Sequence, residues 1–374
     1  TFTPPEYFNW AILYQVSSAK NNYVAQAKIN EGKVEFKLDS AATKGIYKLV
    51  YAAPQDQYNF DIIYNGEEDI ELTFNINTGV VFQKSEENKL LNAYLTAQEN
   101  LGLEIEQFYI EKNMDTLKVL SLFQNQRTIQ KEYEERTKNM LTHHFIIANK
   151  PYIPENYEDP ETYINNITAN YFTNIDFNNP VLQSSNFLAS RSFAYITGVL
   201  HPGKDKISSY NTNIDTIVSL LGATEANFRK PFLESLWQKS VNYNLTDAAN
   251  YLATKHLIPI AISLEDEMMV NKLTKYKRLS IGNIAPDFSW EIETDGKVKT
   301  QKLSELALAE NYILVFWSSS CSHCLEEIPK LNLFTQSLDK TKYKVIAVGL
   351  EDNPIKWENE TIKYPNFINV LKLQ

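Results

Sequence analysis

Cysteine is rare in this chain: of 374 residues, only Cys321 and Cys324 carry a thiol. A structural zinc site usually needs two cysteine pairs, or cysteines with histidines at metal spacing, so a single pair argues against one. Covalent haem attachment needs a histidine directly after the second cysteine, and Leu325 occupies that position. A chain otherwise free of cysteine also avoids mispairing in an oxidising compartment, which is compatible with the cell envelope.

Long apolar runs and basic blocks are absent as well. No run approaches the ~18 apolar residues that a membrane helix needs. The net charge is −10 and no block of lysine and arginine occurs, which argues against nucleic acid or an anionic membrane as a partner. Residues 1–5 are neither a signal peptide nor a lipobox, so we expect the chain to start after a leader that this sequence does not include.

The two cysteines stand where a buried strand is expected to be followed by a helix. Residues 312–317 form an apolar run typical of a strand buried on both faces of a parallel sheet. Residues 318–320 are serines, which favour turns and helix N-caps. The pattern predicts a helix with Cys321 in its first turn. The apolar residues that recur at helical spacing after the pair are Leu325, Ile328, Leu331 and Phe334.

A cysteine in that position is suited to redox chemistry. Unpaired N–H groups and the positive end of the helix dipole favour a thiolate, so a Cys-x-x-Cys thiol can have a pKa of roughly 3.5–7.5 instead of ~8.5. Cys324 lies three residues further on, on the same side of the helix, and can close a disulfide with Cys321. We therefore expect Cys321 to attack and Cys324 to resolve, with a protonated His323 favouring the thiolate further.

Several features of this part of the chain match one known family. They are Phe316-Trp317, the Cys-x-x-Cys pair, Glu327, a helix-kinking Pro329, and residues 281–288, which read Ile-Gly-Asn-Ile-Ala-Pro-Asp-Phe. Together they resemble the thioredoxin fold, and within it the TlpA/ResA-type thiol–disulfide oxidoreductases of bacterial envelopes, with Trp317 and Pro329 as structural residues near the site. Peroxiredoxins share the motif at 281–288 but carry a single peroxidatic cysteine after P-x-x-x-T, so a peroxidase is disfavoured.

The resemblance implies roles, partners and a location. A glutamate at the position of Glu327 tunes the cysteines and helps to move protons in ResA-like proteins; the alternative is a solvated helix residue beside Glu326. The implied redox group is the Cys321–Cys324 disulfide itself, with no further cofactor and no metal. The implied location is the periplasm or cell envelope, with a lipoprotein anchor ahead of this sequence. The implied partners are protein thiols and disulfides, together with an envelope or outer-membrane protein complex.

Three departures from the family pattern keep a second hypothesis open. Ser320 precedes the pair where the family usually has tryptophan, and Val315 stands where thioredoxin itself keeps a buried aspartate, which TlpA-like members also lack. The sequence ends at Gln374 before any cis-proline loop, so we expect the thioredoxin-like domain to be incomplete. The alternative hypothesis is a non-enzymatic subunit or docking module of an envelope assembly, with a vestigial thioredoxin-like domain.

Three regions are expected, which gives a multidomain α+β fold. Residues 1–84 predict an antiparallel β sandwich or barrel, and one of its hairpins joins 22–29 to 33–38. Residues 85–277 predict a helical region that begins with two long antiparallel helices. Residues 278–374 predict the partial thioredoxin-like α/β domain, in which a right-handed strand–helix–strand unit places the cysteines at the carboxyl edge of a parallel sheet.

Smaller expectations concern single motifs. A hairpin is expected around Asp295-Gly296 and a short helix at 304–309. The pair His143-His144 is expected near the end of the second long helix, where adjacent side chains point in different directions and bind one metal poorly. His201 and His256 stand alone in the sequence, so a structural role is expected for both.

Overall fold

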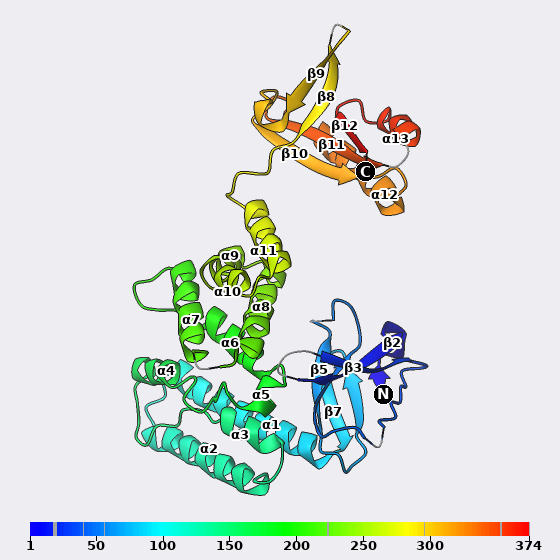
Figure 1. Ribbon diagram of the computed structural model, residues 1–374. Coiled ribbons are helices and arrows are strands. Elements are labelled where there is room, and N and C mark those ends of the chain that lie inside the picture. Colours follow the sequence, from blue (N-terminus) through cyan, green and yellow to red (C-terminus); the bar gives the residue numbers. More distant parts are fainter. Residues whose placement is uncertain are drawn as a thin grey trace. The chain divides into compact units, whose positions relative to one another are not determined.

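The fold was described from a computed structural model, whose described residues are 1–17, 21–39, 41–55, 57–222, 224–294, 296–351 and 354–373. The chain forms two compact units, Thr1–Lys277 and Arg278–Gln374 (Figure 1). The first unit holds β-sheets followed by helices, and the second is an α/β unit that contains both cysteines. This confirms the predicted multidomain α+β class with a C-terminal thioredoxin-like domain.

Two small sheets pack face to face at the start of the chain, as the predicted sandwich requires. Their shared core is aromatic and aliphatic, and includes Phe2, Phe8, Leu13, Tyr47 and Phe74. Within these two sheets, the described strand pairs are antiparallel except β1–β6, which is parallel. The first sheet has the order β1 (Phe2–Thr3), β6 (Glu71–Asn75), β7 (Gly79–Lys84), and the second β3 (Asn21–Lys28), β2 (Trp10–Val16), β4 (Gly45–Val50), β5 (Asn59–Tyr64).

The prediction that residues 33–38 form the second strand of a hairpin is wrong. Only a single bridge, Asn30–Lys33, follows β3, and residues 34–38 form no strand. The alternation of apolar and polar residues there has another cause, because Val34, Phe36 and Leu38 pack against the sandwich core without a strand partner. Strand β2, which pairs with both β3 and β4, was not predicted.

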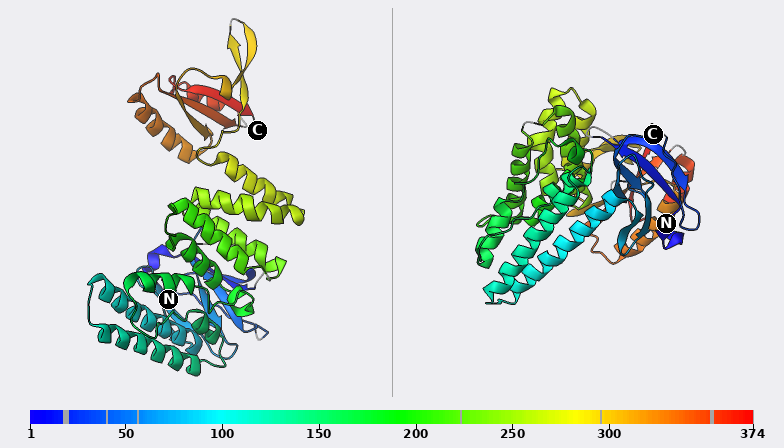
Figure 2. Two further views of the ribbon diagram at one scale, coloured as in Figure 1. Left: turned by 90° about the vertical axis from the view of Figure 1, so that its left-hand side faces the viewer. Right: turned by 90° about the horizontal axis from the view of Figure 1, so that it is seen from below.

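The helical region begins with two long helices, α1 (Glu86–Ile110) and α2 (Thr116–Arg136), which lie antiparallel (Figure 2). Each has an N-cap that satisfies an unpaired backbone donor. The Ser85 hydroxyl accepts the Asn88 N–H at 3.3 Å, and the Asp115 carboxylate accepts the Lys118 N–H at 3.3 Å. The prediction of two long antiparallel helices is confirmed.

His143 and His144 do not lie at the end of the second helix, so that expectation is wrong. They belong to a separate helix, α3 (Thr142–Ala148). The buried carboxylate of Glu87 on α1 starts this helix, since it accepts the backbone N–H groups of Leu141 at 3.1 Å and Thr142 at 2.8 Å. An acidic group at a helix N-terminus satisfies unpaired donors and complements the dipole, and no local sequence pattern reveals a cap from another helix.

Most of the remaining helices of the first unit share one large core, built from residues such as Leu188, Ile196, Ile214, Leu233 and Leu252. Tyr163 packs instead in the separate core between α1 and α2. Within the described part of the chain, no helix combines the length and the apolar character needed to cross a membrane. The remaining helices are α4 (Pro160–Ala169), α5 (Pro180–Gln183), α6 (Phe187–Gly198), α7 (Lys206–Leu220), α8 (Ala226–Asn242), α9 (Thr246–Leu252), a π-helical segment (Ala253–Leu257), α10 (Ile258–Ser263) and α11 (Glu267–Leu279).

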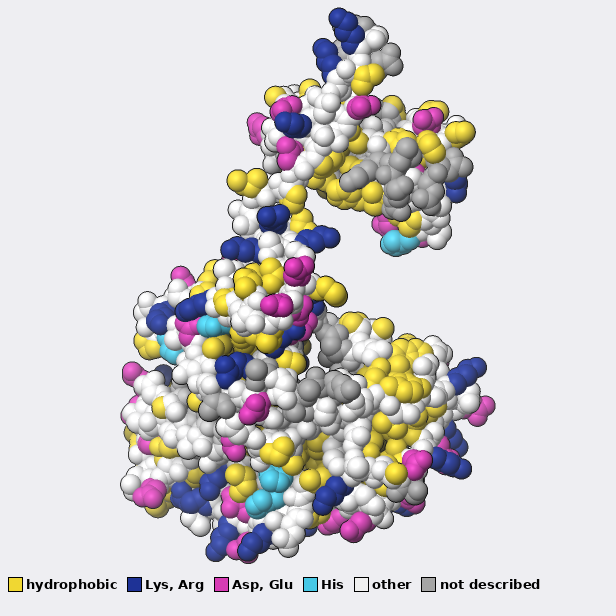
Figure 3. Space-filling view, in the orientation of Figure 1, with side chains coloured by type: hydrophobic (Ala, Val, Ile, Leu, Met, Phe, Trp, Pro, Cys, Tyr) yellow, Lys and Arg dark blue, Asp and Glu magenta, His cyan; other side chains and the backbone are white. Residues whose placement is uncertain are grey.

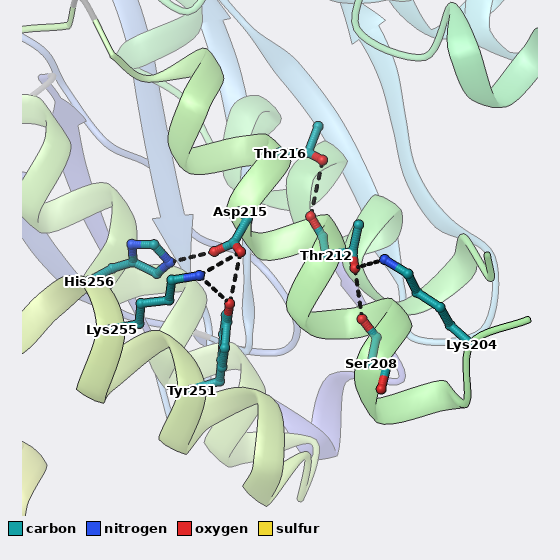
Figure 4. A network of polar contacts seen from close by, with 8 residues as sticks. All are labelled: Lys204, Ser208, Thr212, Asp215, Thr216, Tyr251, Lys255 and His256. Carbon is teal, nitrogen blue, oxygen red and sulfur yellow. Dashed lines mark hydrogen bonds and ion pairs between the residues drawn. The ribbon is translucent and has the colours of Figure 1, made fainter.

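A polar network ties α7 to the π-helical segment (Figure 4). The Asp215 carboxylate accepts hydrogen bonds from Tyr251 Oη at 2.8 Å and Lys255 Nζ at 2.7 Å, and pairs with His256 Nε2 at 2.9 Å. Burial favours a higher pKa for Asp215, but these hydrogen bonds outweigh it and hold the pKa below its usual range. His256 therefore has the contacts of a structural histidine.

The second unit contains the parallel sheet β10 (Asn311–Trp317), β11 (Tyr343–Glu351) and β12 (Ile368–Leu373). Helix α12 (Ser322–Gln336) connects β10 to β11, and α13 (Pro354–Thr361) connects β11 to β12. The predicted strand–helix–strand unit with parallel strands is confirmed. A hairpin of β8 (Ser289–Thr294) and β9 (Lys297–Lys302) precedes the sheet as expected, although Asp295 lies outside the described residues.

Two details of this unit differ from the expectations. The strand buried on both faces is β11, where Ile346 and Ala347 have no exposed surface, whereas Phe316 on β10 is 57% exposed. This difference in burial arises because β11 is the central strand of the sheet, whereas β10 lies at an edge. The short helix expected at 304–309 is a single 3-10 turn, Leu303–Glu305.

We predict that Gly349→Ala destabilises the second unit. A Cβ at Gly349 would lie 2.3 Å from Nε1 of Trp357, which packs directly on the strand backbone, and overpacking of this kind costs roughly 1–3 kcal/mol. Urea unfolding followed by tryptophan fluorescence measures the loss. The matched control is Gly102→Ala in α1, where a Cβ meets nothing within 4 Å and the better helix propensity should add up to about 1 kcal/mol. Equal stability of both variants would contradict this packing.

Candidate active site

Cys321 occupies the N-cap of α12, one position before the helical turn in which it was expected. Its backbone is extended, with φ −87° and ψ 110°, so the sulfur turns back over the first turn of the helix. The Cys321 sulfur accepts the backbone N–H of Cys324 at 3.2 Å. Sulfur thus takes the place that a Ser or Asp oxygen usually fills in an N-cap.

Both cysteines are free thiols, and their environments move their pKa values in opposite directions. The hydrogen bond from the Cys324 thiol lowers the pKa of Cys321 most, and the backbone N–H groups of Cys324 and His323 lower it further. The same thiol–thiol hydrogen bond, followed by burial, raises the pKa of Cys324. The pair therefore holds its first negative charge on Cys321.

Three serines shape the turn between β10 and α12. The hydroxyls of Ser318 and Ser320 lie 2.8 Å apart, and the Ser320 backbone N–H donates to the Ser318 hydroxyl at 3.2 Å. The Cys321 N–H donates to the Ser318 carbonyl at 3.2 Å. The backbone N–H of Ser318 also reaches the Cys324 sulfur and partly offsets the rise in the pKa of that thiol. The turn residues thus contact both cysteines through the main chain.

Glu351 is a site residue that the sequence reasoning missed. It ends β11, is only 3% exposed, and its carboxylate accepts the backbone N–H of Ser319 and the Ser319 hydroxyl, the latter at 3.2 Å. A buried charge needs such partners, and Ser319 is itself fully buried in the turn before Cys321. The available signal was an acidic residue directly after an apolar run at 345–350. Glu351 fixes the turn from the neighbouring strand.

Trp317 lies beneath the turn, as a structural residue. It is 2% exposed and packs with Ile328 of α12, Trp357 of α13 and Tyr364 in the core on one side of the sheet. Pro329 lies inside α12 and is exposed. This core fixes the helix that carries the cysteines against the sheet.

His323 and Glu327 are exposed on α12, and among the described residues no hydrogen bond joins either side chain to a cysteine sulfur. His323 contacts Cys321 through its backbone N–H. The Glu327 carboxylate pairs with Lys330 Nζ at 2.6 Å, and this hydrogen bond, with the charge of Lys330, holds the pKa of Glu327 below its usual range. Both residues border the site, but Glu327 is directed toward Lys330.

Metal ligation has no support in the described residues, which contain no group of three or more His, Cys, Asp or Glu side chains able to hold an ion. His144 Nδ1 lies 2.9 Å from the Asn179 amide, and His201 Nε2 lies 2.8 Å from Asn213 Oδ1. These histidines thus have hydrogen-bond partners in the helical region.

Hydrophobic side chains are exposed on the two elements that flank the cysteines, β10 and α12, and Figure 3 shows hydrophobic side chains on the visible face of this unit. Phe316 lies on β10, and Leu325, Leu333 and Phe334 lie on α12. Leu325, which follows Cys324 directly, is the one of these side chains adjacent to the pair in the chain, and exposed apolar side chains of this kind mark contact surfaces when they are contiguous.

A match to a known protein family lies within this unit. Residues 281–369 match the model of the AhpC/TSA family. The solved structures include a thioredoxin-like protein from Bacteroides caccae with 16% sequence identity, a TM-score of 0.27, and coverage of 59% of this chain and 81% of that one. At this identity and score, the similarity does not bear on function. No curated protein matches the chain.

We predict that alkylation separates the two thiols. Because hydrogen bonds stabilise the Cys321 thiolate, its reaction with iodoacetamide should rise with pH through a midpoint below about 8.5 and then level off, while Cys324 should titrate above that value. Mass spectrometry of peptides from the reduced protein measures both midpoints. In Cys324→Ala, which lacks the thiol donor, the Cys321 midpoint should rise. A common midpoint near 8.5 for both cysteines would exclude the arrangement described above.

We also predict that Glu351 stabilises the turn. Glu351→Ala leaves the buried Ser319 donors without an acceptor, and hydrogen bonds to a charged group contribute about 1.5–3 kcal/mol, so the free energy of unfolding should fall by that order. Glu351→Gln keeps one acceptor oxygen and should lose less. Urea unfolding measures both variants. No difference between Glu351→Ala and the unchanged protein would show that the turn does not depend on this carboxylate.

Proposed function

We propose that the protein is a TlpA/ResA-type thiol–disulfide oxidoreductase that exchanges disulfides through Cys321 and Cys324. The observation that carries the proposal is one pair of thiols at a helix N-terminus, where the Cys321 sulfur accepts a backbone N–H and a shared thiol hydrogen bond is the largest cause of a lowered pKa at Cys321 and a raised pKa at Cys324. Perturbed pKa values in an exposed motif are typical of catalytic groups, and two neighbouring titratable groups with opposite shifts divide the roles between them. The AhpC/TSA match of the same unit supports redox chemistry.

In the reducing direction, the first step is attack by Cys321. Its thiolate forms a bond to one sulfur of a substrate disulfide, and the other sulfur leaves as a thiolate that takes up a proton. The product is a mixed disulfide between Cys321 and the substrate. The Cys321 charge and its thiol–thiol hydrogen bond, which both raise the pKa of Cys324, are then gone.

The second step is resolution by Cys324. With its pKa lowered, the Cys324 thiol gives up its proton, and the thiolate bonds to the Cys321 sulfur as the remaining substrate sulfur leaves. Two electrons have moved from the dithiol to the substrate, and the protein ends as the Cys321–Cys324 disulfide. The backbone N–H of Ser318, which reaches the Cys324 sulfur, favours this second thiolate.

The proposed roles of His323 and Glu327 oppose each other. A protonated His323 favours the Cys321 thiolate and makes the pair more oxidising, whereas a Glu327 carboxylate disfavours the thiolate. Because Lys330 pairs with Glu327 at 2.6 Å, much of that negative charge is balanced, and we assign no direction of electron flow.

The proposed setting is the periplasm or cell envelope, with protein thiols and disulfides as substrates and an envelope or outer-membrane complex as a further partner. This rests on the TlpA/ResA resemblance of the motif residues. The second candidate remains a non-enzymatic docking module with a vestigial redox domain. The size of the first unit, Thr1–Lys277, which contains neither cysteine, favours that candidate.

We predict that the full chain reduces insulin in the presence of dithiothreitol. Cys321→Ala should abolish the increase in rate over dithiothreitol alone, because no attacking thiolate remains. Cys324→Ser should trap a mixed disulfide on Cys321, visible as a mass shift that reducing agent reverses. Gly102→Ala, far along the chain in α1, is the control and should keep full activity. If the unchanged protein gives no acceleration with several donors, the docking module becomes the better account.

A further inference from the structure

Two sheet edges of the first unit lie against helix α1, and one of them is closed. Asn88, buried in the first turn of α1, accepts the backbone N–H of Ile63 on β5 at 2.9 Å and donates to the Ile63 carbonyl at 2.7 Å. The side-chain amide thus forms the two hydrogen bonds that a neighbouring strand would form. The edge of β5 is closed at this point, as is usual for an edge in a native protein.

Strand β7 is the other edge, and its outward backbone groups are open. The Phe74 N–H on β6 donates to the Thr1 carbonyl at 2.7 Å, so Phe74 directs its hydrogen bonds away from its β7 partner, Val80. Phe74 and Val80 are thus opposite residues that do not bond each other. In an antiparallel strand pair, both residues of a non-hydrogen-bonded pair point their backbone N–H and C=O away from the partner strand. Val80 and, two residues on, Phe82 therefore direct N–H and C=O to the free edge. Among the described residues these groups have no hydrogen bond to another element.

A groove of about 580 Å³ runs between this edge and α1. We call it the β7–α1 groove. Its β7 side contributes Thr78, Val80, Val81 and Phe82, and its α1 side Lys89, Asn92, Ala93, Thr96, Ala97 and Asn100.

The groove has the length of a short strand. The six residues of β7 span about 20 Å, and the α1 wall from Lys89 to Asn100 spans about 16 Å. Five or six residues of extended chain cover about the same distance. On the helix wall, Ala93 and Ala97 leave room for a backbone, and the amides of Asn92 and Asn100 offer both donors and acceptors.

A cavity of about 240 Å³ with a mixed lining adjoins the groove, and Phe82 and Asn92 line both. Asp61, Asn186 and Ser190 form part of its polar wall, and Asp61 and Asn186 are hydrogen-bonded to each other. Leu91, Phe145 and Phe187 contribute to its wall. Its volume is sufficient for one hydrophobic side chain of a segment that lies in the groove.

The charge of the groove also points to its occupant. Lys89 is the only charged residue in the lining, and it is exposed, with no ion pair to any described carboxylate. Since no Asp or Glu lines the groove, an acidic side chain or a C-terminal carboxylate near Lys89 would be attracted.

We propose that the β7–α1 groove binds an extended segment of a partner protein, which adds to β7 as a further strand. Backbone hydrogen bonds to Val80 and Phe82 would supply affinity, and alternate side chains would supply specificity, with one apolar residue in the adjoining cavity and one acidic residue near Lys89. This binding site lies outside the redox unit and does not depend on the proposed disulfide exchange.

The test selects peptides from a random library displayed on phage, using the full chain, and measures binding of the enriched peptides by fluorescence anisotropy. They should share alternating apolar residues and an acidic residue. Val80→Pro, which removes an outward N–H, and Ala93→Tyr, which fills the groove, should each weaken binding by about tenfold or more. Val80→Thr keeps the N–H, and Glu99→Tyr places the same ring on α1 outside the groove lining, so both should bind normally. Lys89→Glu should reverse the preference for acidic peptides.

Circular dichroism identifies any variant that fails to fold, and Ala93→Tyr changes an exposed helix position and remains informative if Val80→Pro does not fold. Failure to enrich peptides over the Ala93→Tyr protein would overturn the proposal. Unchanged peptide binding by both Val80→Pro and Ala93→Tyr would also overturn the proposal. A doubled mass by light scattering that Val80→Pro abolishes would assign the edge to a second copy of this chain instead of a partner.

Discussion

The hydrogen bonding between Cys321 and Cys324 is the interaction on which the proposed chemistry depends. A helix N-terminus leaves backbone donors unpaired, and here the Cys321 sulfur accepts one of them at 3.2 Å. The same sulfur accepts the Cys324 thiol, which lowers one pKa and raises the other. These contacts require a well-placed turn, and the buried Glu351 carboxylate holds that turn at Ser319 from the next strand. The parallel sheet is thus the scaffold that gives the two thiols opposite pKa shifts, on which the proposed roles of Cys321 as attacking and Cys324 as resolving group depend.

Local pattern predicted the elements around the site but not the contacts between them. The apolar run before Cys321 and the helical spacing after it indicated the strand–helix–strand unit that β10, α12 and β11 form. Glu351 was missed because its role arises only when β11 pairs with β10 in register, which places it beside a turn 32 residues earlier. The start of α3 was missed for the same reason, since its cap, Glu87, lies 55 residues away on α1. The alternation at 33–38 was wrongly predicted to be a hairpin strand, because side chains that pack alternately against a core give the same pattern without a strand partner.

The two sheet edges that lie against α1 in the first unit differ, because one is hydrogen-bonded and the other is open. We infer that the first unit binds a partner while the second unit carries out the proposed redox chemistry. Asn88 closes β5, whereas β7 faces a groove lined by alanines, amides and a single lysine. A protein that exchanges disulfides in other proteins gains from a separate surface that holds a partner segment, because tethering raises the local concentration of the reacting groups. The exposed Leu325, which follows Cys324 directly, would then need to provide only weak contact at the disulfide itself.

The most direct test of the central claim is the reduction potential of the Cys321–Cys324 pair. The protein is equilibrated with glutathione or dithiothreitol buffers, and free thiols are counted by the mass shift on alkylation. The account predicts a reversible two-electron transition within the range of known exchange proteins, about −120 to −270 mV. A pair that never oxidises, or that never becomes reduced in these buffers, would contradict a redox function and leave a scaffold that carries the motif without its chemistry.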